Sequence, residues 1–297
     1  MENSTMDQSF RISCFNEYDR LKQVIVVPPN FMKITDVINI TQRHYVQDNI
    51  NSDIAVQQHH HFVETLKKEG IHVIPFEAKK ELNEQVFTRD IGFTIGNDFF
   101  IAALNKDLRK PEGKVLKKWL KEKNIPFYQI HINSIEGGDI LVDNNKVWVG
   151  VSNRTTLPAI HYLQTKLSNF HVIPVPIRKD ILHLDCAFNI ISHDTAIIFK
   201  PGISDTSLKD LQNHYHLIEV TEEEQFSLGP NVLSIGNKKL ISISSNKRLN
   251  KKLSSCGFDV MEVEFSEIIK SGGSFRCCTL PIVREANKDL VKPYLNT

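Results

Sequence analysis

Cysteine is scarce in this sequence, and its few copies are not spaced like a disulfide framework. There are five, an odd number, and only the last two are close together. They are Cys14, Cys186, Cys256, Cys277 and Cys278. A scattered, odd set is not typical of a secreted domain that disulfides hold together, so we expect reduced thiols. We expect Cys14 and Cys256 to be structural.

Long apolar runs are missing as well. No segment is long enough to cross a bilayer, and the first ten residues, MENSTMDQSF, lack the apolar core of a signal peptide. These absences predict a cytoplasmic protein that does not bind a membrane. No charge of one sign dominates either, because 36 basic residues stand against 35 acidic ones. This balance argues against a nucleic-acid partner and leaves small polar ligands and a homo-oligomer open.

The chain also lacks a phosphate-binding glycine loop and the ligand spacing of a zinc site. The run His59, His60 and His61 looks like a metal site, but successive helical residues point about 100° apart and cannot share one ion. We expect these histidines to form a solvated helix face. The lysines at 117, 118, 121 and 123 are interpreted in the same way. The sequence therefore implies no cofactor and no metal.

What the chain does contain is one order of elements repeated along its length. A hairpin of two apolar strands is followed by a helix and a further strand. The equivalent hairpin positions are Asp90, Asp139, Asp185, Asn231 and Cys277, with separations of 49, 46, 46 and 46 residues. A constant period of this size is typical of a repeat architecture. The sequence thus predicts an α/β protein with a pseudo-fivefold repeat of strand–strand–helix–strand units.

The two ends of the chain predict that the repeat closes on itself. The first unit begins with an unpaired strand at 21–27, LKQVIVV, and the last unit has only one hairpin strand. Pairing these strands completes a fifth hairpin and gives a five-bladed α/β propeller. We therefore expect a single domain over 1–297, with an N-terminal extension at 1–19 and a loop or lid at 30–56. The alternative, two α/β domains divided near residue 150, does not explain the period.

In a closed ring, residues at equivalent positions of the different repeat units meet at a common centre. They are Asp90, Glu136, Asp139, His183, Asp185 and Cys277. Several carboxylates around one cavity are costly to bury without compensation, which implies a cationic ligand. His183 and Asp185 are two residues apart, so on a strand their side chains share one face. A thiol beside an imidazole that a carboxylate orients is an arrangement that activates a nucleophile.

Cys277 is the candidate for that nucleophile. It follows a glycine pair in the stretch 272–285, GGSFRCCTLPIVRE, and precedes a short apolar strand. A tight glycine turn followed by a strand fixes where the cysteine side chain points. Free cysteine is more often a buried, inert hydrophobe, and the motif taken alone favours that alternative. The acids and the histidine predicted at the same centre reverse this preference.

Four ordered motifs resemble those of the guanidine-modifying superfamily with the pentein fold. They are FTRD at 87–90, EGGD at 136–139, HLD at 183–185 and GGSFRCCT at 272–279. The superfamily includes arginine deiminases, dimethylarginine dimethylaminohydrolases, agmatine deiminases and amidinotransferases, and the resemblance covers about residues 20–285. It implies that Cys277 is the nucleophile and that His183 is the general acid and base. It also implies that Asp90 and Glu136 contact a guanidinium and that Glu136 orients His183.

The same resemblance assigns three further residues to substrate binding. Arg109 stands nineteen residues after Asp90, and Arg154 eighteen residues after Glu136. Both spacings match family arginines that hold a substrate α-carboxylate. Glu84, six residues before Asp90, matches another guanidinium-binding acid of dimethylarginine hydrolases. The alternative for the two arginines is a solvated charge at a helix start, the usual fate of a surface arginine.

Chain length and one residue type point to different substrates. The chain is compact, like a dimethylarginine hydrolase, and lacks the helical insertion of typical arginine deiminases. Asp185, however, stands where the hydrolases tend to have lysine and the deiminases and amidinotransferases have aspartate. Asp90 and Asp185 on opposite sides of a guanidinium would each accept charge-assisted hydrogen bonds from an unmethylated nitrogen. We therefore predict that an unmethylated guanidino or ureido amino acid is processed better than its asymmetric dimethyl analogue.

The predicted function is hydrolysis of a C–N bond in a guanidino or ureido amino acid, such as arginine, a methylarginine or citrulline, by covalent cysteine catalysis. One alternative is amidino transfer at the same site, in which an amine replaces water as the acceptor. The alternative from another class is a non-catalytic binding protein, since the same ring fold serves as a ribosome-subunit anti-association factor. A binding protein does not need a thiol, a histidine and several acids together, so the sequence favours an enzyme.

Overall fold

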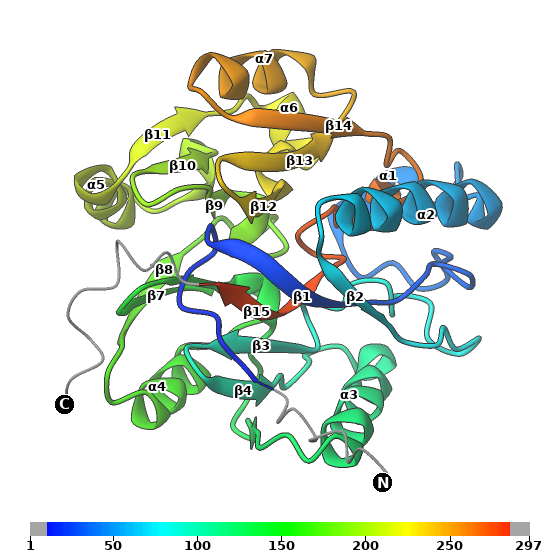
Figure 1. The fold of residues 1–297 in the computed structure, drawn as a ribbon, viewed down its shortest axis with the longest axis horizontal. Helices are drawn as coiled ribbons and strands as arrows, with labels where there is room; N and C mark the ends of the chain where they lie inside the picture. Colours follow the sequence, from blue (N-terminus) through cyan, green and yellow to red (C-terminus); the bar gives the residue numbers. More distant parts are fainter. Residues whose placement is uncertain (1–10, 286–297) are drawn as a thin grey trace, which may run out of the picture.

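The computed structural model describes residues 11–285 of the chain. Within that range the strands form five separate three-stranded sheets (Figure 1). In each sheet the central strand pairs antiparallel with one neighbour and parallel with the other. The protein is therefore an α/β protein built from five sheets of the same topology.

The sheets follow one another along the chain, except that the first is completed by the last strand. The first contains β15 (Leu280–Glu285), β1 (Arg20–Val26) and β2 (His72–Pro75), and the second contains β3 (Gly92–Ile95), β4 (Asp98–Ile101) and β5 (Tyr128–Gln129). The third contains β6 (Ile140–Asp143), β7 (Lys146–Val151) and β8 (His171–Pro176). The fourth contains β9 (Phe188–Ile190), β10 (Thr195–Ile198) and β11 (His216–Glu219), and the fifth contains β12 (Leu233–Gly236), β13 (Lys239–Ile243) and β14 (Asp259–Val263).

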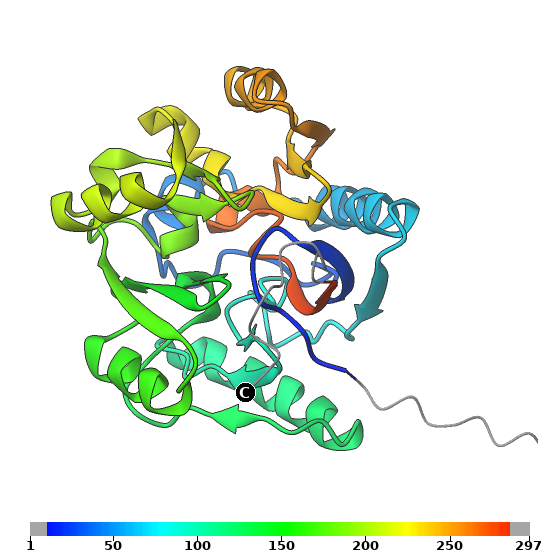
Figure 2. The same ribbon diagram turned by 60° about the vertical axis from the view of Figure 1, so that its left-hand side comes forward.

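One longer helix precedes the parallel third strand of each sheet, which is the order that the sequence period predicts. These helices are α2 (Ser52–Lys68), α3 (Lys110–Glu122), α4 (Leu157–Lys166), α5 (Asp205–His214) and α7 (Lys247–Ser255). They lie at the periphery, with the sheets towards the middle (Figures 1 and 2). Two shorter helices, α1 (Ile40–Tyr45) and α6 (Glu222–Phe226), lie outside this scheme. None of the helices in residues 11–285 has the length and apolar character needed to cross a membrane.

The first and last strands pair, as the sequence predicts. β1 and β15 run antiparallel, with Arg20 opposite Glu285 and Ile25 opposite Leu280. This pairing completes the fifth hairpin from segments at opposite ends of the chain. It also places the Cys277 loop, which leads into β15, next to the rest of the first sheet.

Part of the extension predicted at 1–19 falls within the described residues and contacts two sheets. Ser13 bridges Val283 of β15, and Cys14 bridges Gly96 next to β3. Cys14 is buried, as expected of a structural thiol. Cys256 is exposed at the end of α7, so its interpretation as a structural thiol is wrong.

The segment 30–56, predicted to be a loop or lid, contains α1 and the first turn of α2. Asn51 caps α2, because its side-chain oxygen accepts hydrogen bonds from the backbone N–H groups of Asp53 (3.1 Å) and Ile54 (3.2 Å). An asparagine cap satisfies two backbone donors that would otherwise lack a partner. It explains why the helix begins at Ser52, inside the segment predicted to be a loop or lid.

One face of α2 differs from the prediction. His59, expected to be solvated with its two neighbours, is buried and only 3% exposed. It lies three residues before Phe62 and therefore shares the apolar face of the helix. The two ring centroids are 6.2 Å apart. His60 and His61 are exposed, as predicted.

Candidate active site

The loop that carries Cys277 depends on its two glycines. Gly272 has a φ of 93°, in the left-handed region that favours glycine. Gly273 packs against Phe87, so that a Cβ at this position would lie 2.3 Å from the Phe87 ring and 3.0 Å from Cys277 Cβ. A larger residue at 273 would therefore displace the cysteine.

Asn231, the fourth member of the repeat series, holds the same loop by hydrogen bonds. Its side-chain oxygen accepts from the backbone N–H groups of Ser274 (3.2 Å) and Cys277 (3.1 Å). Its amide nitrogen donates to the backbone oxygen of Asp185 (3.3 Å). Asn231 therefore connects the loop to the third unit of the repeat. The repeat period located this residue, whereas its role as a brace is visible only in the structure.

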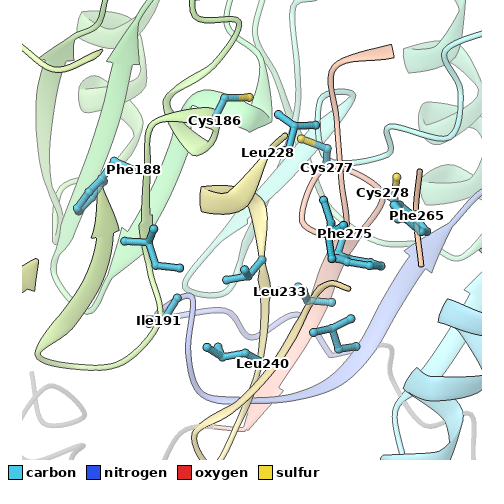
Figure 3. Close-up of a cluster of buried hydrophobic side chains, with 14 of the residues drawn as sticks. Cys186, Phe188, Ile191, Leu228, Leu233, Leu240, Phe265, Phe275, Cys277 and Cys278 are labelled. Carbon is cyan, nitrogen blue, oxygen red and sulfur yellow. The ribbon is translucent and has the colours of Figure 1, made fainter. Parts of the chain in front are cut away.

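The two adjacent cysteines have different surroundings. Cys277 is 2% exposed, and its thiol donates a hydrogen bond to Asp185 Oδ2 at 3.5 Å. Cys278 is fully buried, and burial raises its pKa well above the ordinary range for a thiol. The two sulfur atoms point in different directions (Figure 3). The loop thus presents only Cys277 towards Asp185.

His183 is fully buried and has one ring nitrogen engaged. Nε2 lies 2.7 Å from Glu136 Oε2 in a hydrogen bond. Nδ1 has no hydrogen-bond partner within residues 11–285 and lies 3.6 Å from Asp90 Oδ1, which also lacks a partner there. Gly138 permits this approach, since a Cβ would lie 2.6 Å from Nδ1 and 2.9 Å from Asp90 Oδ1. The arrangement leaves Nδ1 as the nitrogen able to exchange a proton with a ligand.

The charges around His183 favour its protonated form. Burial lowers the pKa of His183, but Asp90, the hydrogen bond with Glu136 and the nearby Asp139 together raise it to about 10. Burial raises the pKa of Glu136, but His183 and the Arg154 guanidinium lower it to about 2. The pair is therefore an imidazolium and a carboxylate at neutral pH.

Both predicted arginines are buried, at 2% exposed each, so the alternative of solvated surface charges is wrong. Arg109 Nη1 lies 2.6 Å from Asp90 Oδ2, and its Nη2 lies 2.8 Å from Glu112 Oε2. Arg154 Nη1 lies 3.3 Å from Glu136 Oε2. Glu112 was not predicted, although its position three residues after Arg109, in the first turn of α3, is a spacing that indicates a helical ion pair.

Asp185 is already paired with a cation of the protein. Its Oδ2 accepts a hydrogen bond from Arg276 Nη1 at 2.6 Å, and both side chains are buried. This contact joins residues 91 positions apart, which explains why the sequence did not indicate it. The predicted preference for an unmethylated substrate assumed a free carboxylate at this position. The ion pair removes the physical basis of that preference.

A cavity lies where the Cys277 loop meets the segment 30–56. It is lined by six of the eight predicted site residues, Glu84, Asp90, Arg109, Arg154, His183 and Cys277. The other two, Glu136 and Asp185, do not line it. Glu136 is hydrogen bonded to His183, which lines the cavity, and Asp185 is paired with Arg276. Ile38, Asn39 and Ser271 also line the cavity and were missed, because no motif marks them in the sequence.

The segment 30–56 covers this cavity through polar contacts. Gln42 of α1 is fully buried, and its amide nitrogen donates to Glu84 Oε1 (2.9 Å) and to Ser271 Oγ (2.7 Å). The Asn39 amide nitrogen donates to the backbone oxygen of Ser271 (3.0 Å). The segment is therefore held against the same groups that line the cavity.

Glu84 is a buried acid with a raised pKa. Burial raises the pKa of Glu84 to about 7, against the opposing effects of Arg109 and of the hydrogen bond from Ser271. A cation that enters the cavity would favour the ionised carboxylate. Glu84 is thus positioned to lose a proton when such a ligand binds.

We expect Glu84 to make the folded protein less stable as the pH rises from 4.5 to about 7. In this window the unfolded chain has lost the Glu84 proton and the folded chain retains it, so the free energy of unfolding decreases with pH. The full effect is on the order of 3 kcal/mol. Glu84→Gln has no proton to lose and should show a smaller decrease. Denaturant unfolding of both proteins on either side of the window measures this, and equal decreases would contradict the assignment.

Asp90, Glu136 and His183 also form a group that could hold a metal ion, since one ligand atom of each lies within 4.8 Å of the others. A metal bound to all three would have to compete with the hydrogen bond between Glu136 and His183. An organic cation that donates hydrogen bonds can bind Asp90 with that bond intact. The donor set therefore fits an organic cation better than a metal ion.

Comparison with known proteins gives consistent similarities. A family model described as N,N dimethylarginine dimethylhydrolase, eukaryotic, matches residues 28–284. YkgA of Bacillus subtilis, described as uncharacterized, is 43% identical over 284 residues, which cover 96% of this chain and 99% of that protein. The N(G),N(G)-dimethylarginine dimethylaminohydrolase of Mycobacterium tuberculosis is 25% identical over 265 residues, which cover 89% of this chain and 86% of that protein.

Solved structures share the fold. The product-bound N-terminal domain of ArgZ, an arginine dihydrolase from cyanobacteria, has a TM-score of 0.82 at 23% identity and covers 90% of this chain and 98% of that chain. SxtG, an amidinotransferase from Microseira wollei, has a TM-score of 0.80 at 16% identity and covers 93% and 98%. At these identities the similarity concerns the fold alone.

Proposed function

This chain belongs to the family described as eukaryotic N,N dimethylarginine dimethylhydrolase, and from that membership we propose that it hydrolyses a C–N bond of a guanidino amino acid through a covalent intermediate on Cys277. One observation carries the proposal. His183 Nδ1 and Asp90 Oδ1 are buried, lack a partner within residues 11–285, and belong to side chains that line one cavity with Cys277. Because buried polar atoms are nearly always hydrogen bonded, this pair indicates a ligand that donates to the acid and exchanges a proton with the imidazole.

In the first half of the reaction the Cys277 thiolate attacks the central carbon of the guanidinium. Asp90 accepts hydrogen bonds from the guanidinium and holds its carbon near the sulfur. His183, protonated in the free site, gives its proton to the departing amine. The C–N bond breaks, and a thiouronium remains on Cys277 while His183 becomes neutral.

In the second half, water replaces the sulfur. Neutral His183 accepts a proton from water as the oxygen attacks the thiouronium carbon, which returns His183 to its starting charge. The C–S bond then breaks and releases the thiolate and a ureido product. The hydroxyl group that came from the attacking water then loses its proton to solvent. The released amine takes up a proton from solvent. The sum is one guanidinium and one water converted to one urea and one ammonium.

The thiolate needs compensating positive charge. Arg276, which pairs with Asp185, is one source within the protein, and the bound guanidinium is the other. Because the substrate itself supplies part of this charge, the site favours cationic guanidino groups over neutral ureido groups. We therefore place guanidino amino acids, N-methylated or not, ahead of citrulline as substrates.

Arg154 and Arg109 are proposed to hold the substrate α-carboxylate. Both guanidinium groups are buried and line the cavity, and Arg154 has the longer contact to its acid, at 3.3 Å against 2.6 Å for Arg109. A carboxylate would therefore compete more readily for Arg154. The binding of a charged carboxylate in a buried site favours an amino acid over its decarboxylated amine.

The architecture around the site is also part of the proposal. We interpret the five sheets and the pairing of β1 with β15 as a five-bladed propeller that forms a single domain. We interpret the segment 30–56 as a lid, because the substrate must displace or pass it to reach Cys277, which is 2% exposed. The polar contacts of Gln42 and Asn39 are the ones that must break when the lid opens.

A comparison of kcat/KM for arginine, asymmetric dimethylarginine, citrulline and agmatine tests this function. We expect agmatine, which lacks the carboxylate, to be about 10- to 100-fold worse than the best amino acid, since a hydrogen bond to a charged group contributes about 1.5–3 kcal/mol. Arg154→Gln should lower kcat/KM for the amino acid more than for agmatine. A preference for agmatine would contradict the roles of Arg109 and Arg154. Release of neither amine, ammonia nor urea from any of these compounds would contradict the enzymatic function.

The same assay distinguishes hydrolysis from amidino transfer. The family description favours water as the acceptor. With glycine added to the guanidino donor, we expect no guanidinylated glycine and an unchanged yield of ureido product. Formation of guanidinylated glycine would assign the chain to amidino transfer.

A further inference from the structure

Cys186 is a second thiol beside Cys277 that the proposed reaction does not use. It ends the short 3-10 turn Leu184–Cys186, directly after the catalytic His183, and is 2% exposed. Its sulfur lies 3.5 Å from Asp185 Oδ1, and the Cys277 sulfur lies 3.5 Å from Oδ2 of the same carboxylate. The sulfur atoms of Cys186 and Cys277 point towards each other (Figure 3). One carboxylate therefore holds two thiols together.

The backbones on both sides of this pair are fixed to each other. Asn231 accepts from the backbone N–H of Cys277 (3.1 Å) and donates to the backbone oxygen of Asp185 (3.3 Å). Arg276, next to Cys277, binds the Asp185 side chain at 2.6 Å. Residues 185–186 and 276–277 thus form one braced unit. A covalent bond between the two sulfurs would join segments that are already in contact.

The two thiols also differ in chemical character. A hydrogen bond with Cys277 and burial together raise the pKa of Cys186 well above the ordinary range. Cys186 therefore remains a neutral thiol, which donates a hydrogen bond to Asp185 Oδ1 (3.5 Å). Cys277 lines the cavity and is the thiol that a small reagent entering through the active site meets first.

We propose that Cys186 is the resolving thiol of Cys277, so that a peroxide converts the pair to a disulfide and reversibly stops the enzyme. In the first step the Cys277 thiolate attacks one peroxide oxygen, the O–O bond breaks, and Cys277 becomes a sulfenic acid with release of hydroxide. In the second step Asp185 Oδ1, which lies 3.5 Å from the Cys186 sulfur, takes up the thiol proton, and the resulting Cys186 thiolate attacks the Cys277 sulfur. The S–O bond breaks, the Cys186 proton leaves with the hydroxyl as water, and an S–S bond forms. Two electrons pass from the sulfurs to the peroxide.

Hydrogen peroxide treatment followed by mass spectrometry tests this proposal. We expect the full-length protein to lose two hydrogen atoms, and a non-reducing digest to contain the peptide 277–284 joined to a peptide that carries Cys186. Dithiothreitol should reverse the bond and restore activity. This mass readout needs no substrate, so it stands or fails independently of the proposed reaction.

Two variants decide the role of Cys186, each compared with its own untreated activity. In Cys186→Ser and Cys186→Ala, Cys277 should proceed to sulfinic acid, and dithiothreitol should recover roughly tenfold less activity than in the unsubstituted protein. Cys278→Ser is the matched control and should behave like the unsubstituted protein. A bond between Cys277 and Cys278, or equal recovery in the Cys186 variants, would overturn the proposal.

Discussion

Replacement of Cys277 by serine is expected to lower kcat/KM by about 10⁴-fold or more, the range seen when a covalent nucleophile is removed. Serine keeps the size of the side chain but replaces the sulfur by a hydroxyl, which is far less nucleophilic near neutral pH. Cys278 is not expected to take over, since its sulfur and that of Cys277 point in different directions (Figure 3) and of the two only Cys277 lines the cavity. Steady-state kinetics with arginine and dimethylarginine measures the effect.

Cys278→Ser provides the control for this prediction. Cys278 is fully buried, and its backbone N–H donates to the backbone oxygen of Ser274 (2.9 Å), so its replacement changes packing without removing the nucleophile. We expect the variant to keep activity within about tenfold of the unsubstituted enzyme, because thiol to hydroxyl is a small change in volume. Retained activity in Cys277→Ser together with lost activity in Cys278→Ser would show that Cys278, and not Cys277, is the nucleophile.

Replacement of His183 by glutamine has the second-largest expected effect, a loss of about 10²- to 10⁴-fold in kcat/KM, the usual contribution of general acid–base catalysis. Glutamine can still hydrogen bond to Glu136 but cannot carry a proton to the departing amine. The pKa of about 10 for His183 also predicts a pH effect. Activity of the unsubstituted enzyme should fall as the pH rises through that value, because the imidazole loses the proton that it donates.

The pH profile separates this role from a structural one. In His183→Gln the residual activity should lack the decrease near pH 10. His59→Gln is the matched control, because His59 is also buried but lies on α2 and does not line the cavity. It should keep both the rate and the profile. An unchanged profile in His183→Gln would show that another group supplies the proton.

The fold was predictable because each unit repeats the same local rules. Hairpins of two apolar strands recurred along the sequence, and β3 and β4, which follow Asp90, form one of them. The constant separation of equivalent residues then aligned the units. The unpaired first strand predicted its partner, since a lone edge strand requires one. A local pattern that repeats five times is stronger evidence for the fold than a single occurrence of that pattern.

The parts that could not be predicted depend on contacts between polar side chains that lie far apart in the sequence. Asp185 was predicted to contact the substrate, but it pairs with Arg276 across 91 positions. The same applies to Gln42, whose contact with Glu84 is set by the path of the segment 30–56 and by no local pattern. Arg109 likewise pairs with Asp90 across 19 positions. Such pairs leave no periodic signal in a sequence.

The measurement that tests the covalent mechanism most directly is mass spectrometry of the enzyme quenched with acid during turnover. Digestion after Arg276 and Arg284 releases the peptide 277–284, which contains both cysteines, so fragment ions must locate the modification. We expect Cys277 to carry the substrate minus its departing amine, with the same added mass from arginine and from dimethylarginine. An adduct on Cys278, or sustained turnover with no adduct in this peptide, would contradict the account.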